Sequence, residues 1–328
     1  MWTRVHIEKQ SIGGKMEKAT KKKSKISIDK NDWQLLSMAG LSVLFLAVFA
    51  YLPMFGLVLA FKDGDGVLNI NTAIFRSDWV GFANFKEFML DKDFVNVLWN
   101  TLGLNLTQLI FTFPAPILFA VLLNELKVKK FKTTVQTITF FPQFLSWVVF
   151  GGIVLSLINM DTGVISKILV SMHLIGNETD IIAEPKYFWS VIILSNILKS
   201  VGWGSVIYLA AICGLDKAQF EAAEIDGANR FQKILHITIP GIASTIIVYL
   251  LLSISGLMNN GIEQILVFQN QLNLSASEVI DTFVLKYGIR QNMYSYATAI
   301  GFFKSVIALI LISGSNFFAK KITGQGLI

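Results

Sequence analysis

The chain has 328 residues, of which 53% are hydrophobic, and its mean hydropathy is +0.59. This apolar content excludes a soluble globular domain of the same size and predicts an all-α protein that crosses a lipid bilayer several times. The 28 Lys and Arg against 22 Asp and Glu give a formal charge of +6, which in a membrane protein is typical of basic loops, so we expect no nucleic-acid partner.

The residue types that bind metals or form disulfides are scarce. Cys213 is the single cysteine, which excludes an internal disulfide and a cysteine-rich metal site. His6, His173 and His236 are far apart and show no ligand spacing. We therefore expect no metal and no cofactor on this chain.

Residues 1–34 are polar and rich in lysine, and they include three consecutive lysines at 21–23. They contain no small-residue cleavage site after a short apolar core, so they lack the pattern of a cleaved signal peptide. We expect a disordered, basic tail on the cytoplasmic side of the membrane. Met16, which precedes EKATKKKSK, is an alternative to Met1 as the natural start of the protein.

Six apolar runs, each longer than the roughly 20 residues that cross the hydrocarbon core, predict six transmembrane helices within a domain at residues 35–320. They cover residues 35–61, 94–124, 133–160, 187–215, 235–262 and 293–319. Pro114 and Pro116 are expected to bend the second helix, and Pro142 is expected to interrupt the third.

The distribution of positive charge orients these helices, because cytoplasmic loops carry an excess of Lys and Arg. With the N-terminus inside, the internal segments hold 18 Lys and Arg and the outer loops hold 8. Both termini, including a short tail at 321–328, and the segment at 216–234 are therefore predicted to be cytoplasmic. On the outer side, FANFKEFM at residues 82–89 predicts a short amphipathic surface helix.

The polar segment between the fourth and fifth helices reads EAAEIDGANRFQKILHITIP at residues 221–240. Asp216 is placed to cap a short helix, with Gln219 completing a capping box. Gly227 suits a left-handed turn at the end of that helix, and residues 228–235 are predicted to form a second helical piece. The expected order is helix, glycine turn, helix and membrane.

This spacing resembles the signature of the membrane subunits of binding-protein-dependent ABC importers, which is E-A-A, three residues, G, nine residues and I-x-L-P. The chain has EAA at 221–223, Gly227 and ITIP at 237–240, so Ile239 in place of Leu is the one departure. The fuller form EAAEIDGAN at 221–229 resembles the carbohydrate branch of the family, and most closely the permeases for polysaccharides and complex oligosaccharides.

The resemblance extends over most of residues 35–320. The stretches that carry it are FANF at 82–85, NT at 100–101, FPQFLSW at 141–147, GWGSVIYLAA at 202–211, NGIEQ at 260–264 and YATAIG at 296–301. Ile262 stands where the family is expected to have Phe, which is a minor departure.

The resemblance implies that the chain is the pore-forming permease of an ATP-driven importer of oligosaccharides or polysaccharide fragments, in the plasma (inner) membrane of a bacterium. It also implies that the polar segment is a coupling helix, which docks in a groove of an ATPase subunit. The residues expected to serve this coupling are Glu221, Ala222, Ala223, Asp226, Gly227, Arg230 and Pro240. The implied partners are two ATPase subunits that bind ATP and Mg²⁺, a second, non-identical permease and an extracytoplasmic solute-binding protein.

The sequence itself argues against an enzyme. A phosphate-binding P-loop requires G-x-x-x-x-G-K-[ST], and the nearest approach, at residues 14–16, lacks the first glycine and the hydroxyl. No Ser, His and acidic residue occur together in a catalytic motif. We expect ATP to be hydrolysed by the partner ATPase.

Six residues are candidates for the solute path: Lys199, Trp203, Asn259, Asn260, Gln264 and Lys304. Lys199 and Lys304 are the charged residues inside the predicted helices, and each should face the protein interior, because a lysine in lipid costs several kcal/mol. Either they attract hydroxyl-rich or acidic sugars, or they bind carbonyls and hold helices together. Trp203 is a candidate to stack on a sugar, although a tryptophan in an apolar helix is more often a packing residue.

Other functions are left open by the residues alone. An ABC permease for another polar solute, such as a glycerol-phosphate-like compound, has the same architecture. An ion-coupled transporter is expected to carry Asp or Glu inside its helices, and none is present there. A membrane-embedded enzyme needs a polar catalytic cluster, which the sequence does not show. The two lysines slightly favour acidic over neutral glycans.

Overall fold

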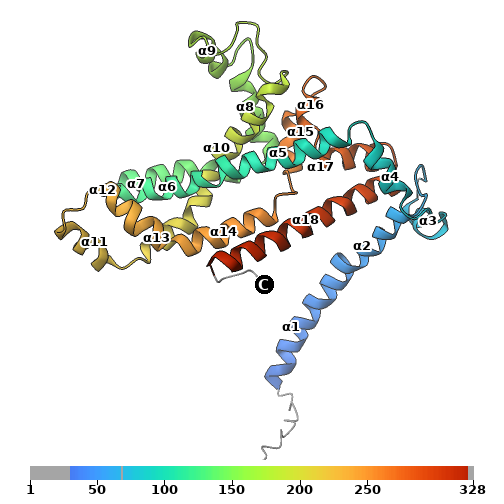
Figure 1. Cartoon of the computed structure of the whole chain (residues 1–328), viewed down its shortest axis with the longest axis horizontal. Helices are drawn as coiled ribbons and strands as arrows, with labels where there is room; N and C mark the ends of the chain where they lie inside the picture. Colours follow the sequence, from blue (N-terminus) through green and yellow to red (C-terminus); the bar gives the residue numbers. More distant parts are fainter. Residues whose placement is uncertain (1–29, 68, 324–328) are drawn as a thin grey trace, which may run out of the picture. The chain divides into compact units, whose positions relative to one another are not determined.

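The computed structural model describes residues 30–67 and 69–323 (Figure 1), so most of the predicted basic tail, including Met16, and residues 324–328 lie outside the described part. Helices make up most of the described part, and its one strand-like feature is an isolated bridge between Lys62 and Trp79. The chain divides into two units, Met1–Met54 and Phe55–Ile328, which are described separately.

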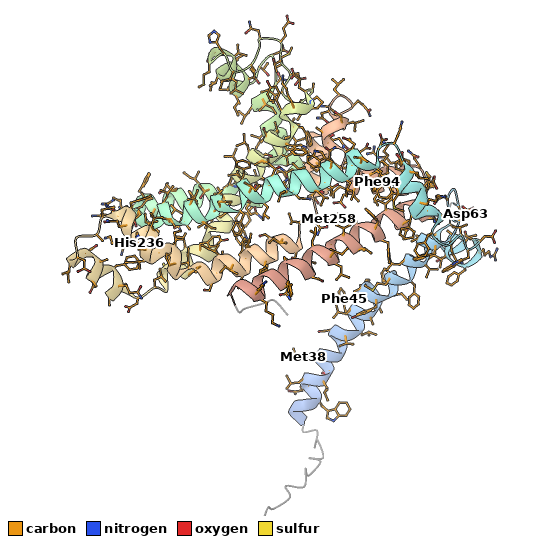
Figure 2. All side chains as sticks on the ribbon, in the orientation of Figure 1. Met38, Phe45, Asp63, Phe94, His236 and Met258 are labelled. Atoms are coloured by element: carbon orange, nitrogen blue, oxygen red, sulfur yellow. The ribbon has the colours of Figure 1, made fainter. Side chains whose placement is uncertain are left out.

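The first unit is a single apolar helix. It consists of α1 (Lys30–Leu46), a π-helical turn (Ala47–Tyr51) and the short α2 (Leu52–Met54). Large apolar side chains along it, such as Met38 and Phe45 (Figure 2), are exposed, which is typical of a helix surrounded by lipid. The apolar stretch Trp33–Phe61 is long enough to cross a membrane.

The second unit contains the other predicted spans. α5 (Phe94–Thr112) with α6 (Pro114–Glu125), α10 (Pro185–Cys213) and α18 (Tyr294–Thr323) supply three further helices that are long and apolar enough to cross a membrane. Two bent pairs bring the number of candidate spans to six among the described residues, which agrees with the six runs in the sequence.

The third predicted span is broken and does not continue as one helix through residues 133–160. α7 (Lys129–Phe140) and a 3₁₀ turn (Phe141–Phe144) are followed by α8 (Trp147–Ile158), and the axes differ by 108°. Pro142 lies in the 3₁₀ turn, as expected of a residue without a backbone N–H. Ser146 then caps α8 by accepting a hydrogen bond from the amide of Val149 at 3.3 Å.

The second and fifth spans also differ from the sequence prediction. The helix continues through Phe113, whose φ of −67° and ψ of −46° are helical, so Pro114 acts as the first residue of α6. The fifth span is bent by 61° between Arg230–Gly241 and α14 (Ala243–Ser255). It ends at Ser255 and does not reach residue 262, because residues 256–261 form turns and irregular backbone.

Short helices connect the spans. They are α3 (Ile70–Arg76), α4 (Ala83–Leu90), α9 (Val164–Ser171), α11 (Lys217–Ile225), α12 (Arg230–Lys233), α13 (Ile239–Gly241), α15 (Ile262–Phe268), α16 (Leu274–Ser277) and α17 (Ile280–Val284). The α4 helix confirms the helix predicted at residues 82–89. Figure 1 shows α4 and α11 at opposite ends of the second unit, as expected of loops predicted on opposite sides of a membrane.

Three apolar clusters hold the second unit together. One joins Phe188 and Ile192 of α10 to Phe268 of α15. Another packs α6 against Tyr208 of α10, and a third surrounds Phe88 of α4. The central helix α10 therefore takes part in two of the clusters, and it contacts both halves of the broken third span.

Hydrogen bonds from α5 fix the irregular segment that precedes α18. The Nδ2 of Asn100 donates to the carbonyls of Ser275 and Glu278 at 2.9 and 3.1 Å. The Oγ1 of Thr101 accepts from the amide of Ile280 at 2.9 Å, and the Thr101 residue is completely buried. These bonds satisfy backbone groups that α16 and α17 leave free.

We expect Thr101→Val to destabilise the second unit by about 1–3 kcal/mol, because it leaves the buried amide of Ile280 without an acceptor. Thr107→Val is the matched control, since the Thr107 hydroxyl bonds to the carbonyl of Gly103 within the same helix. Chemical unfolding of the purified protein in detergent, followed by circular dichroism, measures both changes. Equal losses for the two variants would contradict this role of Thr101.

Candidate coupling segment and translocation cavity

The polar segment at 216–234 folds as two short helices joined by a glycine turn. Asp216 caps α11, and its Oδ1 accepts from the amide of Ala218 at 2.9 Å. The cap is therefore confirmed, but the predicted box with Gln219 is not formed. A capping box exists instead at α12, where Asn229 and Gln232 exchange hydrogen bonds of 2.8 and 2.9 Å.

Gly227 makes the turn that was predicted for it. Its φ of +77° is left-handed, and the amides of Gly227 and Ala228 bond back to the carbonyls of Glu224 and Ala223 at 3.1 and 2.8 Å. This is the Schellman pattern that ends a helix. The second piece differs from the prediction of a helix over 228–235, because α12 covers Arg230–Lys233 and continues as a π-helix, Ile234–Thr238.

An ion pair joins the two short helices. The Nζ of Lys233 lies 2.7 Å from the Oε1 of Glu224. The hydrogen bond from Lys233 and its positive charge lower the pKa of the Glu224 carboxyl below its usual 4.5. Because the pKa is depressed, the contribution of this ion pair is present above pH 4.5 and is lost as the pH falls through the pKa in the folded protein.

The outer face of this segment is open to a partner. Most residues assigned to coupling, namely Glu221, Ala222, Asp226, Gly227, Arg230 and Pro240, are exposed, and Ala223 is half-buried. Two large apolar side chains lie beside them, Ile225 at 87% exposure and Phe231 at 68%. The sequence analysis missed both, although apolar residues in a polar loop are a signal for a protein interface.

A polar cavity of about 370 Å³ lies among α5, α10, α14 and the break in the third span. A second cavity of about 300 Å³ shares part of its wall. The residues that line both are Gln108, Gln143, Asn196, Ser200 and Asn259. All five are uncharged, and each offers a hydrogen-bonding side chain to the cavity.

Several of these polar groups have spare hydrogen-bonding capacity. The Nδ2 of Asn196 donates to the Oε1 of Gln108 at 3.2 Å, and the hydroxyl of Ser200 donates to the carbonyl of Asn196 at 2.7 Å. The Nε2 of Gln108 and the Oγ1 of Thr112 are buried without a partner among the described protein atoms. Buried polar atoms of this kind are expected to bond to water or to a bound solute.

Aromatic rings border the same cavity. Trp203 lines it and is 55% exposed, and its ring meets that of Phe144 edge to face, with centroids 6.2 Å apart. Tyr249 lies on the wall contributed by α14. The cavity therefore combines amides and hydroxyls with ring faces.

Five of the six solute-path candidates line the two cavities. Trp203 and Asn259 border the larger one, and Lys199, Asn260 and Gln264 border the smaller. Gln264 is buried, and its Nε2 donates to the carbonyl of Ile192 at 2.7 Å. The Oδ1 of Asn260 is buried without a partner in the described part of the chain.

The two lysines make contacts inside the protein. Lys304 borders neither cavity and forms an ion pair with Asp281 of α17. Lys199 is 5% exposed, and its Nζ donates to the carbonyls of Pro142, Gln143 and Leu145.

The sequence analysis missed most of the cavity wall. The residues are Asn105, Gln108, Thr112, Gln143, Asn196, Ser200, Tyr249 and Ser253. Three pairs among them are four residues apart on apolar helices: Gln108 with Thr112, Asn196 with Ser200, and Tyr249 with Ser253. This spacing puts each pair on one helix face, and it was a signal available in the sequence.

No group of three His, Cys, Asp or Glu that could hold a metal ion occurs within residues 30–67 and 69–323. The described features are a bundle of apolar helices, a neutral polar cavity between them and an exposed coupling segment at one end. They define the membrane subunit of a transporter.

The family of this subunit follows from comparison with known proteins. The family described as "Binding-protein-dependent transport system inner membrane component" matches residues 94–324, and the chain belongs to it. It is therefore a permease subunit of an ABC importer and not an enzyme.

Protein LplB of Bacillus subtilis (strain 168) is 42% identical over 302 residues, which are 92% of each chain. The polygalacturonan/rhamnogalacturonan transport system permease protein YteP of the same strain is 37% identical and covers 87% of each chain. A crystal structure of a bacterial alginate ABC transporter, in complex with an alginate pentasaccharide-bound periplasmic protein, has a chain that matches with a TM-score of 0.81. That chain is 33% identical, and the match covers 91% of this chain and 98% of that one.

We expect Glu224→Gln to increase amide hydrogen exchange in α11, because the variant loses the ion pair to Lys233. Glu221→Gln is the matched control, since the described part of the chain offers the Glu221 carboxylate no hydrogen bond or ion pair. Exchange measured by mass spectrometry above pH 4.5 reports the difference. Equal exchange in the two variants would show that the ion pair does not hold α11.

Proposed function

We propose that this chain forms one half of the membrane path of a bacterial ABC importer for complex carbohydrates, oligosaccharides or polysaccharide fragments. The observation that carries the proposal is the neutral polar cavity, whose wall is made of amides, hydroxyls and aromatic rings. The names of relatives support the proposal. YteP is named as a permease of polygalacturonan/rhamnogalacturonan transport, and the alginate transporter is described as importing an acidic polysaccharide.

The chemistry of this wall suits a sugar. Each sugar hydroxyl both donates and accepts, and the side chains of Gln108, Asn196 and Gln143 can do the same. Trp203 and Tyr249 offer flat apolar faces on which a pyranose ring can lie.

The same wall is less suited to the alternatives. A glycerol-phosphate-like solute requires cationic groups for its phosphate, and the one charged residue that lines these two cavities, Lys199, already bonds to three carbonyls. An ion-coupled transporter requires a carboxylate in the path. Asp281 is paired with Lys304 and does not line either cavity.

The open side of the cavity supports a second permease as the other half of the path. Phe144, which contacts Trp203, is 72% exposed. Other large apolar side chains on α10, such as Leu194 and Leu198, are also exposed and precede Trp203 in the sequence. Such a surface is covered either by lipid or by a second, non-identical permease. We propose the second permease for the part that adjoins the cavity.

The coupling segment is the proposed docking site for the ATPase subunits. We propose that both chain ends and α11 face the cytoplasm of a bacterium, where two ATPase subunits bind ATP and Mg²⁺. Glu221 and Ala222 present a carboxylate and a small, flat surface to an ATPase groove. The movement of α11 passes through α12 to the fifth span, because these elements are continuous in the chain. On the outer side, an extracytoplasmic binding protein delivers the carbohydrate.

We expect Asn196→Leu to lower oligosaccharide uptake by about tenfold or more, because it removes an amide from the cavity and leaves a neighbouring polar group unpaired. Thr107→Val on α5 is the control, since Thr107 does not line the described cavities. Uptake of labelled oligosaccharides by cells, competed with unlabelled glycans or glycerol phosphate, measures the effect. Competition by glycerol phosphate alone would favour the other solute class.

We expect Glu221→Lys and Gly227→Pro to abolish the stimulation of ATP hydrolysis by the loaded binding protein. Glu221→Lys reverses the charge at the docking face, and Gly227→Pro is incompatible with a φ of +77°. The measurement is ATPase activity of the complete transporter in lipid, with co-purification of the ATPase as a second readout. Arg76→Lys, at the last residue of α3, is the control, because α3 and α11 lie at opposite ends of the second unit (Figure 1). Full stimulation in both variants would refute this docking site.

A further inference from the structure

The break in the third span is bound to α10 by one ammonium group. The Nζ of Lys199 donates to the carbonyls of Pro142, Gln143 and Leu145 at 3.0, 3.1 and 2.6 Å. An ammonium has three N–H groups, so these bonds use all of them. The axes of α7 and α8 differ by 108° here. The carbonyl of Pro142 also accepts from the amide of Leu145 at 3.2 Å in the 3₁₀ turn, so the break replaces the regular bonding of a continuous α-helix.

A second contact, one helical turn further along α10, fixes the same region. Gly202 is buried, and a Cβ at this position would overlap the carbonyl of Thr139 in the last turn of α7. Only glycine allows the two backbones to come this close. Lys199 and Gly202 together therefore hold the end of α7 and the break against α10.

This contact between α10 and the break determines which side chain of the break lines the cavity. Gln143 lies in the wall of both cavities, beside Asn196 and Ser200 of α10. Phe144, the next residue, meets the ring of Trp203 with centroids 6.2 Å apart. The break thus adds the amide of Gln143 to the wall that α10 supplies, and its Phe144 packs against Trp203 of that wall.

The charge of Lys199 is directed into the protein. In addition to the three carbonyls, the ring of Trp147 lies 5.3 Å from its Nζ and that of Phe150 lies 5.8 Å away. Lys199 is 5% exposed. A uronate in the cavity would have to compete with these partners for the ammonium.

We propose that Lys199 is a positioning residue and not a solute ligand: with Gly202 it holds the broken third span so that Gln143 forms part of a sugar subsite and Phe144 supports Trp203 of the same subsite. The subsite rests on the proposed carbohydrate function, whereas the positioning does not. It follows that Lys199 does not select acidic over neutral glycans.

The test of the positioning uses a reporter cysteine. Gln143→Cys is made in a Cys213→Ser background, since Cys213 is the single native cysteine. The complete transporter in lipid vesicles is then labelled with a charged, water-soluble methanethiosulfonate. We expect Lys199→Met to slow labelling by about tenfold or more, because the cysteine leaves the aqueous wall when the charged hydrogen bonds are lost.

Two other variants are compared with Lys199→Met in the same labelling experiment. Gly202→Ala leaves the ammonium in place but pushes α7 away, so it should slow labelling as well and should not add to the effect of Lys199→Met. Lys62→Met is the matched control, because Lys62 also donates to a backbone carbonyl, that of Ile74 at 2.7 Å, away from the break. If the Lys199→Met protein does not assemble into the complete transporter, labelling is measured in two other variants. These are Lys199→Gln, which keeps two N–H donors, and Gly202→Ala.

Labelling of Gln143→Cys at the parental rate in the Lys199 and Gly202 variants would overturn the proposal, whatever the solute is. Uptake supplies the second readout, with oligogalacturonides as acidic probes and arabino-oligosaccharides as neutral probes. We expect Lys199→Met to reduce both by the same factor and Lys199→Arg to restore part of the loss. A loss confined to oligogalacturonides would overturn the proposal and make Lys199 a charge selector. Absence of uptake of both probes by the wild type would count against the carbohydrate function alone.

Discussion

The structure depends on hydrogen bonding the backbone groups that its interrupted helices leave free. In a membrane protein such groups have no bulk water to bond with, and each one left unpaired costs several kcal/mol. The chain meets this constraint with side chains from unbroken helices. Lys199 of α10 bonds to the carbonyls at the break in the third span, and Asn100 and Thr101 of α5 bond to the segment before α18. Side chains of the continuous helices thus stabilise the interrupted ones by hydrogen bonding to their backbone.

The same constraint explains where the cavity lies. Irregular backbone at membrane depth is tolerated where it is buried in protein or lines a polar space. The break at residues 141–146 and the turns at 256–261 both border the cavities, and both contribute polar side chains, such as Gln143 and Asn259. The charged groups nearby bond within the protein, Lys199 to three carbonyls and Lys304 to Asp281. The wall of the larger cavity has no charged side chain among the described residues, which suits a hydroxyl-rich solute more than an ion.

The candidate coupling segment is joined to the fifth span by short, hydrogen-bonded elements. A Schellman turn at Gly227 ends α11, and the ion pair between Glu224 and Lys233 joins α11 to α12. The α12 helix then passes through a π-helical turn into α13 without a loop. The exposed face at Glu221 and Ile225 is therefore connected to the fifth span without a long loop. The exposed apolar side chains of this face are those that an ATPase groove would bury.

Local patterns in the sequence determined the number of spans, the coupling segment and the family. Apolar runs are recognised by length, the cap at Asp216 and the turn at Gly227 depend on nearest neighbours, and the family match at 94–324 agrees with the motif at 221–240. Only the tertiary structure decided that the third span is broken, that Lys304 pairs with Asp281, and which amides form the cavity. These depend on which distant helices come together: Lys199 and Pro142 are 57 residues apart. No local propensity specifies such a contact, because it forms only when α10 packs against the broken helix.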